Sequence, residues 1–129
     1  MSLHPAYFNT RFQVAQMPQV WPPDFVIVTA YATTGELWTD AENLRADNAL
    51  REQIAQMAVW HWPVTGYDPD TGHAEPGWAV ALTRADGVRL GAEYRQDAIF
   101  CVRGDALEVI SCRTGDADSV GSFRNRLEG

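Results

Sequence analysis

The stretch that decides the fold is Thr39–Met57, TDAENLRADNALREQIAQM. Thr39 and Glu42 have the spacing of a capping box, in which the threonine hydroxyl accepts a first-turn amide and the glutamate reaches back to the cap. Good helix formers follow, with apolar side chains at helical spacing. The pattern predicts a helix from Asp40 to Met57. The stripe expected to face a sheet is Leu44, Leu50, Ile54 and Ala58.

Three segments around this helix are expected to be strands. Phe25 to Ala32 (FVIVTAYA) is apolar on both faces and rich in β-branched residues, which is typical of a central strand. Val59 to Gly66 alternates between two sets of side chains, and its Pro63 favours an edge strand because proline cannot donate to a ladder. After the turn-rich Tyr67 to Pro76, Gly77 to Thr83 is the third strand.

The second half of the chain predicts a shorter helix and a closing hairpin. Thr83 offers a cap for a helix that reaches about Tyr94. Ala98 to Arg103 and Ala106 to Cys112 then form two strands joined by a two-residue turn.

The register of this hairpin separates the two cysteines. Cys101 would lie opposite Glu108, and Cys112 opposite Asp97, so a disulfide between them would strain the ladder. We therefore expect free thiols, as in a reducing cytoplasm. The N-terminal residues also lack the basic and apolar regions of a signal peptide, which favours a cytoplasmic location.

The order of these elements predicts the fold class. The sequence β-α-β-β-α-β matches a ferredoxin-like split βαβ arrangement, an α+β fold whose first strand lies between the last and the third. We expect one domain over residues 1–129, with a mainly antiparallel sheet and an extra C-terminal hairpin strand. A helix over 4–18, ended by Pro18, would precede the core at 24–112, and a loose tail would occupy 113–129.

Composition and charge exclude several classes of partner. The formal net charge is −7, the sequence pI is about 4.7, and no run of basic residues exists. Nucleic acids are therefore not expected as partners, because phosphate contacts supply most of their affinity for proteins. No apolar stretch is long enough to span a bilayer, so no membrane partner is expected.

Metal-binding motifs are incomplete. Asp68–Gly72 resembles the start of a calcium loop, but the twelfth loop position is Ala79 where a glutamate is required. An Asx-Pro turn explains the same residues. No histidine or cysteine pair has the spacing of a transition-metal site. We expect neither a metal nor another cofactor.

In the predicted topology, polar residues from distant parts of the chain meet at the end of the sheet where the first strand finishes. This rim collects the end of that strand, the capped helix start, the turn between the second and third strands, and the entries to the third and fourth strands. The residues concerned are Tyr31, Asn43, Asp68, Asp70, His73, Glu75, Gln96 and Asp97.

Two roles are open for Glu75. Beside Asp97 it would form a general acid/base pair, with the pKa of one carboxyl raised by its neighbour. Alternatively, it bonds backbone amides or Gln96 and holds the rim together.

The main helix directs further polar residues towards the sheet. Asn43, Asp47 and Arg51 recur every four residues along the apolar stripe, where buried polar groups need partners. Asp47 and Arg51 can pair with each other, while Asn43 would point to the rim. The alternative is that this row marks the edge of the stripe and only fixes packing.

Several short motifs carry a resemblance to a known family. They are Val28-Thr29-Ala30-Tyr31, Asn43, Gly66-Tyr67-Asp68, Glu75-Pro76-Gly77 and Gln96-Asp97-Ala98-Ile99-Phe100. In order and spacing, from about Phe25 to Val102, they resemble a family of short bacterial proteins, domain of unknown function 3293. The resemblance implies a bacterial protein in whose family pattern Asn43, Glu75 and Gln96 feature. It implies no activity.

Three hypotheses for function follow. The first is a small ligand-binding or interaction module, with a polar pocket formed by Tyr31, Asn43, Asp47, Arg51, Glu75, Gln96 and Asp97, whose ligand is small and neutral or cationic. The second is an enzyme that uses Glu75 as a general acid/base on a small polar or cationic substrate. The third is a protein-interaction or homodimerisation domain. It would act through an apolar sheet face if Trp60, Trp62 and Trp78, otherwise expected in the core, were left uncovered.

Overall fold

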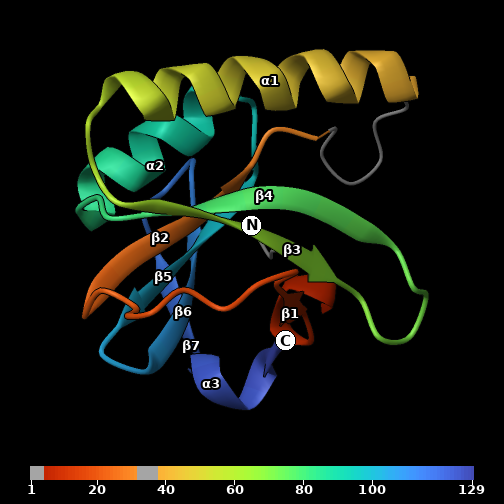
Figure 1. Cartoon of the computed structure of the whole chain (residues 1–129). Coiled ribbons are helices and arrows are strands. Elements are labelled where there is room, and N and C mark those ends of the chain that lie inside the picture. Colours follow the sequence, from red (N-terminus) through yellow and green to blue (C-terminus); the bar gives the residue numbers. More distant parts are fainter. Residues whose placement is uncertain (1–4, 32–37) are drawn as a thin grey trace.

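The computed structural model describes residues 5–31 and 38–129 of the chain (Figure 1). In these residues a single eight-stranded sheet has the strand order β7-β6-β5-β2-β4-β3-β1-β8. The strands are β1 (Arg11–Gln13), β2 (Asp24–Thr29), β3 (His61–Tyr67), β4 (Ala74–Val80), β5 (Ala98–Arg103), β6 (Ala106–Ser111), β7 (Ala117–Ser122) and β8 (Leu127–Glu128). The helices are the 3-10 helix η1 (Pro5–Phe8), α1 (Asp40–Gln56), α2 (Arg84–Glu93) and α3 (Phe123–Arg126).

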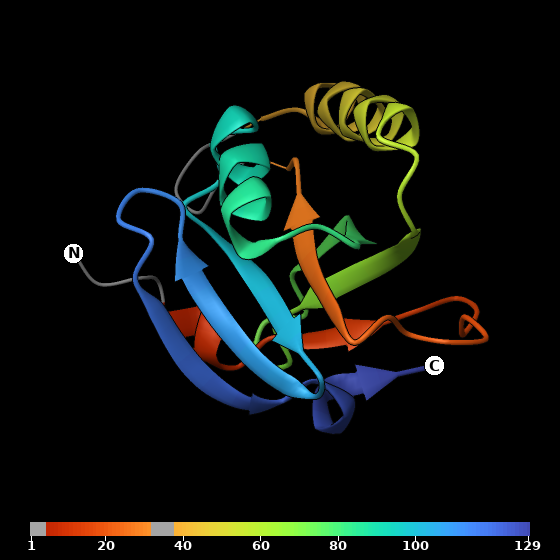
Figure 2. The ribbon, with the colours of Figure 1, turned by 90° about the vertical axis from the view of Figure 1, so that its left-hand side faces the viewer.

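The sheet curls into a half-barrel with two separate cores. Helices α1 and α2 cover its outer face, whereas β1 and β7, from opposite halves of the strand order, lie on the side away from these helices (Figure 2). The outer core joins Leu50, Ile54 and Leu90 to alternate residues of the central strands, such as Val26 and Val28. The inner core contains the other alternate residues. Its buried members include Phe12, Phe25, Ile27, Ala79, Phe100, Leu107 and Phe123.

The prediction of a ferredoxin-like fold was wrong. Four central strands do have the order β5-β2-β4-β3, with β2 between β5 and β4, and pair antiparallel. The complete sheet, however, has eight strands, is mixed because β1 and β8 are parallel, and is curled. Three pairings go beyond the prediction. Those of β1 with β3 and with β8 join segments far apart in the chain, and such pairings leave little local signal in the sequence, whereas that of β6 with β7 is a further hairpin.

Both ends of the chain differ from the prediction. The helix expected over 4–18 is replaced by η1 and β1, and the tail over 113–129 that was expected to be loose forms β7, α3 and β8. Strand β1 pairs with β3 through Phe12 and Gly66, and β7 pairs with β6 through Asp118 and Val109. These segments are ordered by partners rather than by their own propensity.

The capping-box prediction for α1 was confirmed. The Thr39 hydroxyl accepts the Glu42 amide at 3.1 Å, and the Glu42 carboxylate accepts the Thr39 amide at 3.0 Å. The predicted stripe was only half right: Leu50 and Ile54 are buried, but Leu44 is 56% exposed and Ala58, beyond the end of the helix, is also exposed.

The strands predicted at 25–32, 59–66 and 77–83 correspond to β2, β3 and β4, and their ends differ from the prediction by up to three residues.

The prediction that Pro63 lies on an edge strand was wrong, since β3 lies between β4 and β1. Strand β1 pairs only with Thr65 to Tyr67, so Pro63 lies outside that pairing and its missing amide hydrogen costs no ladder bond. Trp60 and Trp62 pack against the inner core and Trp78 against the outer core.

The second helix and the hairpin follow the prediction. Helix α2 is capped by Thr83, and Cys101 pairs with Glu108 in the β5–β6 ladder. The Cys112 amide donates to the Asp97 carbonyl at 2.9 Å, and both cysteines are free.

Arg126 connects the two ends of the curled sheet. Its guanidinium donates to the carbonyls of Phe8 and Thr10, each at 3.0 Å, and to the Val120 carbonyl of β7 at 2.6 Å. Nearby, Phe123 of α3 packs against Phe12 and Phe25, with ring centroids 5.6 and 5.3 Å apart. The N-terminal segment is thereby fixed against the inner face.

Candidate functional site

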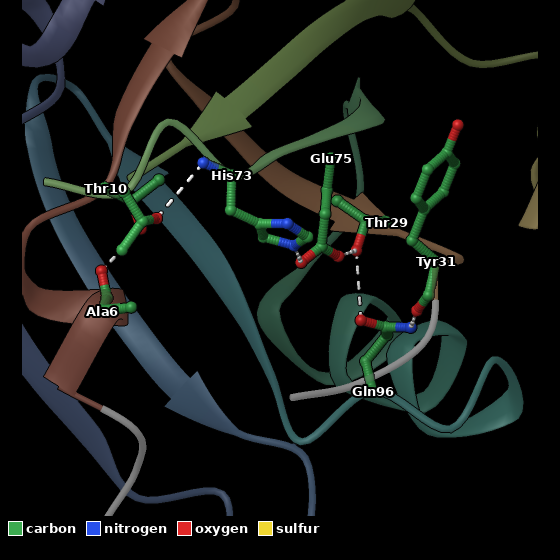
Figure 3. Close-up of polar contacts among 8 residues, drawn as sticks. Ala6, Thr10, Thr29, Tyr31, His73, Glu75 and Gln96 are labelled. Carbon is green, nitrogen blue, oxygen red and sulfur yellow. Dashed lines mark hydrogen bonds and ion pairs between the residues drawn. The ribbon is translucent and has the colours of Figure 1, made fainter. Parts of the chain in front are cut away.

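Four polar side chains meet where β2 ends and β4 begins; we call Thr29, His73, Glu75 and Gln96 the rim group (Figure 3). The Thr29 hydroxyl lies 3.1 Å from Gln96 Oε1 and 3.4 Å from Glu75 Oε1. The other carboxylate oxygen of Glu75 lies 3.1 Å from His73 Nε2. The Glu75 carboxylate is therefore contacted by Thr29 and His73, and Thr29 in turn links it to Gln96.

The strand register explains why these side chains share a face. Thr29 is opposite Gly77 in the β2–β4 ladder, and Glu75 lies two residues before Gly77, so it points to the same face. A Cβ at Gly77 would lie 2.7 Å from both Thr29 Cγ2 and the Val28 carbonyl oxygen, so a larger residue would push the two strands apart. Glycine at this position permits the contact between Thr29 and Glu75.

Gln96 is the buried anchor of the rim group, with 7% of its surface exposed. Its amide nitrogen donates to the carbonyls of Tyr31 at 2.8 Å and Tyr94 at 3.1 Å. Because these two acceptors take both amide hydrogens, the side-chain oxygen is left to accept from Thr29. Arg95, with a φ of +58°, turns the chain between α2 and Gln96.

The Glu75 carboxylate can accept further hydrogen bonds. The Thr29 hydroxyl has one hydrogen, so it can donate to either Gln96 or Glu75 but not fully to both. The side chain of Glu75 is 25% exposed and that of His73 is 69% exposed. The Glu75 carboxylate can therefore accept a hydrogen bond from an incoming cation. Its contact with the His73 imidazole would also allow a proton to pass between the two side chains.

A second polar contact links α1 to β4. Trp78 Nε1 donates to Asp47 Oδ1 at 3.2 Å. Burial raises the pKa of Asp47, an effect opposed by the Trp78 hydrogen bond and by the charge of Arg51. Burial also raises the pKa of Tyr31, with smaller contributions from Asp47, Asp40 and Glu75. The charges of both this contact and the rim group thus act on Tyr31.

The structure brings together only part of the predicted site. Glu75 and Gln96 are in the rim group, and Tyr31 joins it through its backbone carbonyl. Asn43 and Asp47 are partly buried on α1, whereas Arg51 and Asp97 are exposed. The predicted Asp47–Arg51 pair is an electrostatic interaction rather than a direct bond among the described contacts.

Two residues of this region were missed by sequence reasoning. Thr29 interrupts the otherwise apolar segment FVIVTAYA, which was the available signal. Tyr7, from η1, packs edge-to-face on Phe100 with ring centroids 6.1 Å apart. Its pKa is raised by burial and then by Asp97 and Glu75. No local pattern indicated that Tyr7 would reach this end of the sheet.

Residues 5–31 and 38–129 contain no group of three or more His, Cys, Asp or Glu side chains placed to hold a metal ion. No helix in this part of the chain has the length and apolar character needed to cross a membrane.

The fold and the rim group define a small α+β domain with a curled sheet and a carboxylate held at one end of its inner face. The sequence matches the family described as "Protein of unknown function (DUF3293)" over residues 28–99, more than half of the chain, and the protein belongs to this family. The expected resemblance is therefore confirmed. No curated protein and no solved structure matches the chain.

The matched segment divides the site. It includes the whole rim group together with α1, β4 and Trp78. It excludes Tyr7, β1 and everything after Ile99. The rim group thus lies in the part shared with the family, and the part that completes the inner face lies outside the match.

Proposed function

We propose that this protein is a binding module for a small cationic molecule, which it holds at the rim group through the Glu75 carboxylate. The observation that carries the proposal is that Glu75 is partly buried and contacted by a hydroxyl and an imidazole. Among the described residues, no arginine side chain forms an ion pair with it.

Within the described part of the chain, three other carboxylates, unlike Glu75, form ion pairs with arginines. Glu108 pairs with Arg84, Glu128 with Arg11, and Asp86 with Arg89. A partly buried carboxylate is stabilised by a nearby positive charge, and the ion-pair partner of Glu75 is an imidazole that is charged only when protonated, so Glu75 would gain from a cation supplied by a ligand.

The wider electrostatic field acts in the same direction. The chain carries a net charge of −7, and Asp40, Asp47 and Glu75 all act on Tyr31 beside the rim group. Such a field raises the local concentration of cations and disfavours anions.

A direct test is an NMR titration of the ¹⁵N-labelled protein with ethylammonium chloride at constant ionic strength. For a probe of three non-hydrogen atoms the ceiling of binding free energy is about −4.5 kcal/mol, so the Kd is on the order of 1 mM or weaker. Concentrations up to on the order of 100 mM are therefore needed. We expect saturable shifts of the Gln96 side-chain amide and of the Thr29 and His73 backbone amides.

Two variants and one anion complete the design. Glu75→Gln keeps the shape of the side chain and removes its charge, so it should abolish the saturable shifts. Glu52→Gln removes a charge from an exposed position of α1 and should leave them unchanged. Sodium acetate should produce no saturable shifts at the rim group. Equal shifts in the Glu75→Gln and wild-type proteins would refute the proposal.

A further inference from the structure

Tyr7 shares the inner face with the rim group although it comes from a distant part of the chain. Its ring packs on Phe100 of β5, which is opposite Ile27 in the β2–β5 ladder. Thr29 lies two residues beyond Ile27, and Glu75 points to the same face from β4. The Tyr7 side chain therefore lies on the face to which the Glu75 carboxylate is directed.

The backbone around Tyr7 is fixed by contacts on both sides. The Thr10 hydroxyl donates to the Ala6 carbonyl at 2.8 Å, and Arg126 donates to the carbonyls of Phe8 and Thr10. Asn9 donates to Asp70 at 3.1 Å and so ties the segment to the β3–β4 turn. Figure 3 shows Ala6 and Thr10 on the side of His73 and Glu75 opposite to Gln96.

The Tyr7 hydroxyl remains protonated at neutral pH. Burial raises its pKa from that of an ordinary tyrosine, and the negative charges of Asp97 and Glu75 raise it further. A phenol in this state donates a hydrogen bond, whereas the Glu75 carboxylate on the same face only accepts. Tyr7 is therefore suited to a hydrogen-bond acceptor on a ligand, and Glu75 to a hydrogen-bond donor or a cation.

We infer that Tyr7 is a specificity-determining residue of the site, and that the ligand class is a small cation with a neutral acceptor next to its charged group, such as an amino amide or an amino alcohol. The cation pairs with Glu75 while the Tyr7 hydroxyl donates to the neutral acceptor. This inference rests on the proposed function and goes further by naming the second recognition element.

Two probes of similar size separate the two elements. Ethylammonium supplies only the cation, and glycinamide supplies an ammonium group with an adjacent carbonyl. Both are titrated by NMR at about pH 7, below the pKa of about 8 of an α-amino group. We expect glycinamide to bind about fivefold more tightly, the factor that corresponds to one hydrogen bond of about 1 kcal/mol.

Tyr7→Phe tests the assignment, because it keeps the ring on Phe100 and removes only the hydroxyl. Glycinamide should lose its advantage in this variant, while the affinity for ethylammonium stays the same. Glu75→Gln should weaken both probes. Tyr67→Phe is the matched control, since the Tyr67 hydroxyl donates to the Glu128 carboxylate at 2.8 Å, and it should keep the preference.

The outcomes distinguish the two proposals. If neither cation binds the wild-type protein, the proposed function fails and the inference fails with it. If both bind equally, or if Tyr7→Phe keeps the preference for glycinamide, only the role of Tyr7 is overturned. The wild-type comparison of the two probes decides the ligand class even if the Tyr7→Phe variant does not fold.

Discussion

Gln96→Glu is expected to make the stability of the protein strongly dependent on pH. The substitution replaces the amide nitrogen, which donates to the carbonyls of Tyr31 and Tyr94, by an oxygen at a site that is 7% exposed. At neutral pH both carbonyls lose their donor and face a carboxylate. At about 1–3 kcal/mol for each unpaired group, the loss in free energy of unfolding is roughly 2–6 kcal/mol.

Acid should restore part of this loss. The new carboxyl has a folded-state pKa above its unfolded value of about 4.3, because burial and two carbonyls disfavour the charge. Its penalty is therefore smallest below about pH 4.3, where both states are protonated and the carboxyl can donate to one carbonyl. The penalty grows as the pH rises through the folded-state pKa. We expect the difference from wild type to shrink by about 1–3 kcal/mol between about pH 7 and pH 4.

Urea unfolding followed by tryptophan fluorescence at a series of pH values measures this difference. Gln19→Glu, at an exposed position, is the control and should match the wild type within about 0.5 kcal/mol throughout. A loss of the same size at every pH would show that the Gln96 amide is not held by the two carbonyls.

Three further changes test the packing around the site. Trp78→Phe removes the donor to Asp47 and should cost about 1–3 kcal/mol in urea unfolding, with a further rise in the pKa of that carboxyl measurable by NMR. Arg126→Met leaves three backbone carbonyls without their donor and should cost about 3 kcal/mol, whereas Arg124→Met, at an exposed position, should be near neutral. Gly87→Ala improves helix propensity by about 1 kcal/mol, yet the new Cβ would lie 2.6 Å from a valine of β2. A net loss of about 1–3 kcal/mol is therefore expected, and an increase in thermal stability would show that α2 can move away from the sheet.

Local signals predicted the elements that local interactions form. The capping box of Thr39 and Glu42 and the cap at Thr83 located both long helices, because each signal is complete within four residues. The hairpin of β5 and β6 followed from a two-residue turn, and its register placed Cys101 opposite Glu108 as predicted. Neither inference needed a contact with a distant part of the chain.

Pairing with other strands explains what was missed. Phe12 suggested part of a helix, but its segment is a strand because it pairs with Gly66, which lies 54 residues later. The polar segment Ala117–Ser122 has weak strand propensity, and pairing with β6 orders it. In the site, Glu75 and Gln96 could be predicted from topology alone, whereas Tyr7 depends on these additional strands and on Arg126.

Ligand recognition would involve both residues 28–99, which match the family, and residues outside them. Residues 28–99 contain the rim group, but they cannot bury the inner face by themselves, because Phe12 and Phe123 complete it from outside the match. Tyr7 belongs to this completing part, so cation binding and selection of a neutral acceptor are carried by different regions of the chain. A family member that kept Glu75 but closed its inner face without a tyrosine at this position would still bind ethylammonium, and it would bind glycinamide no more tightly.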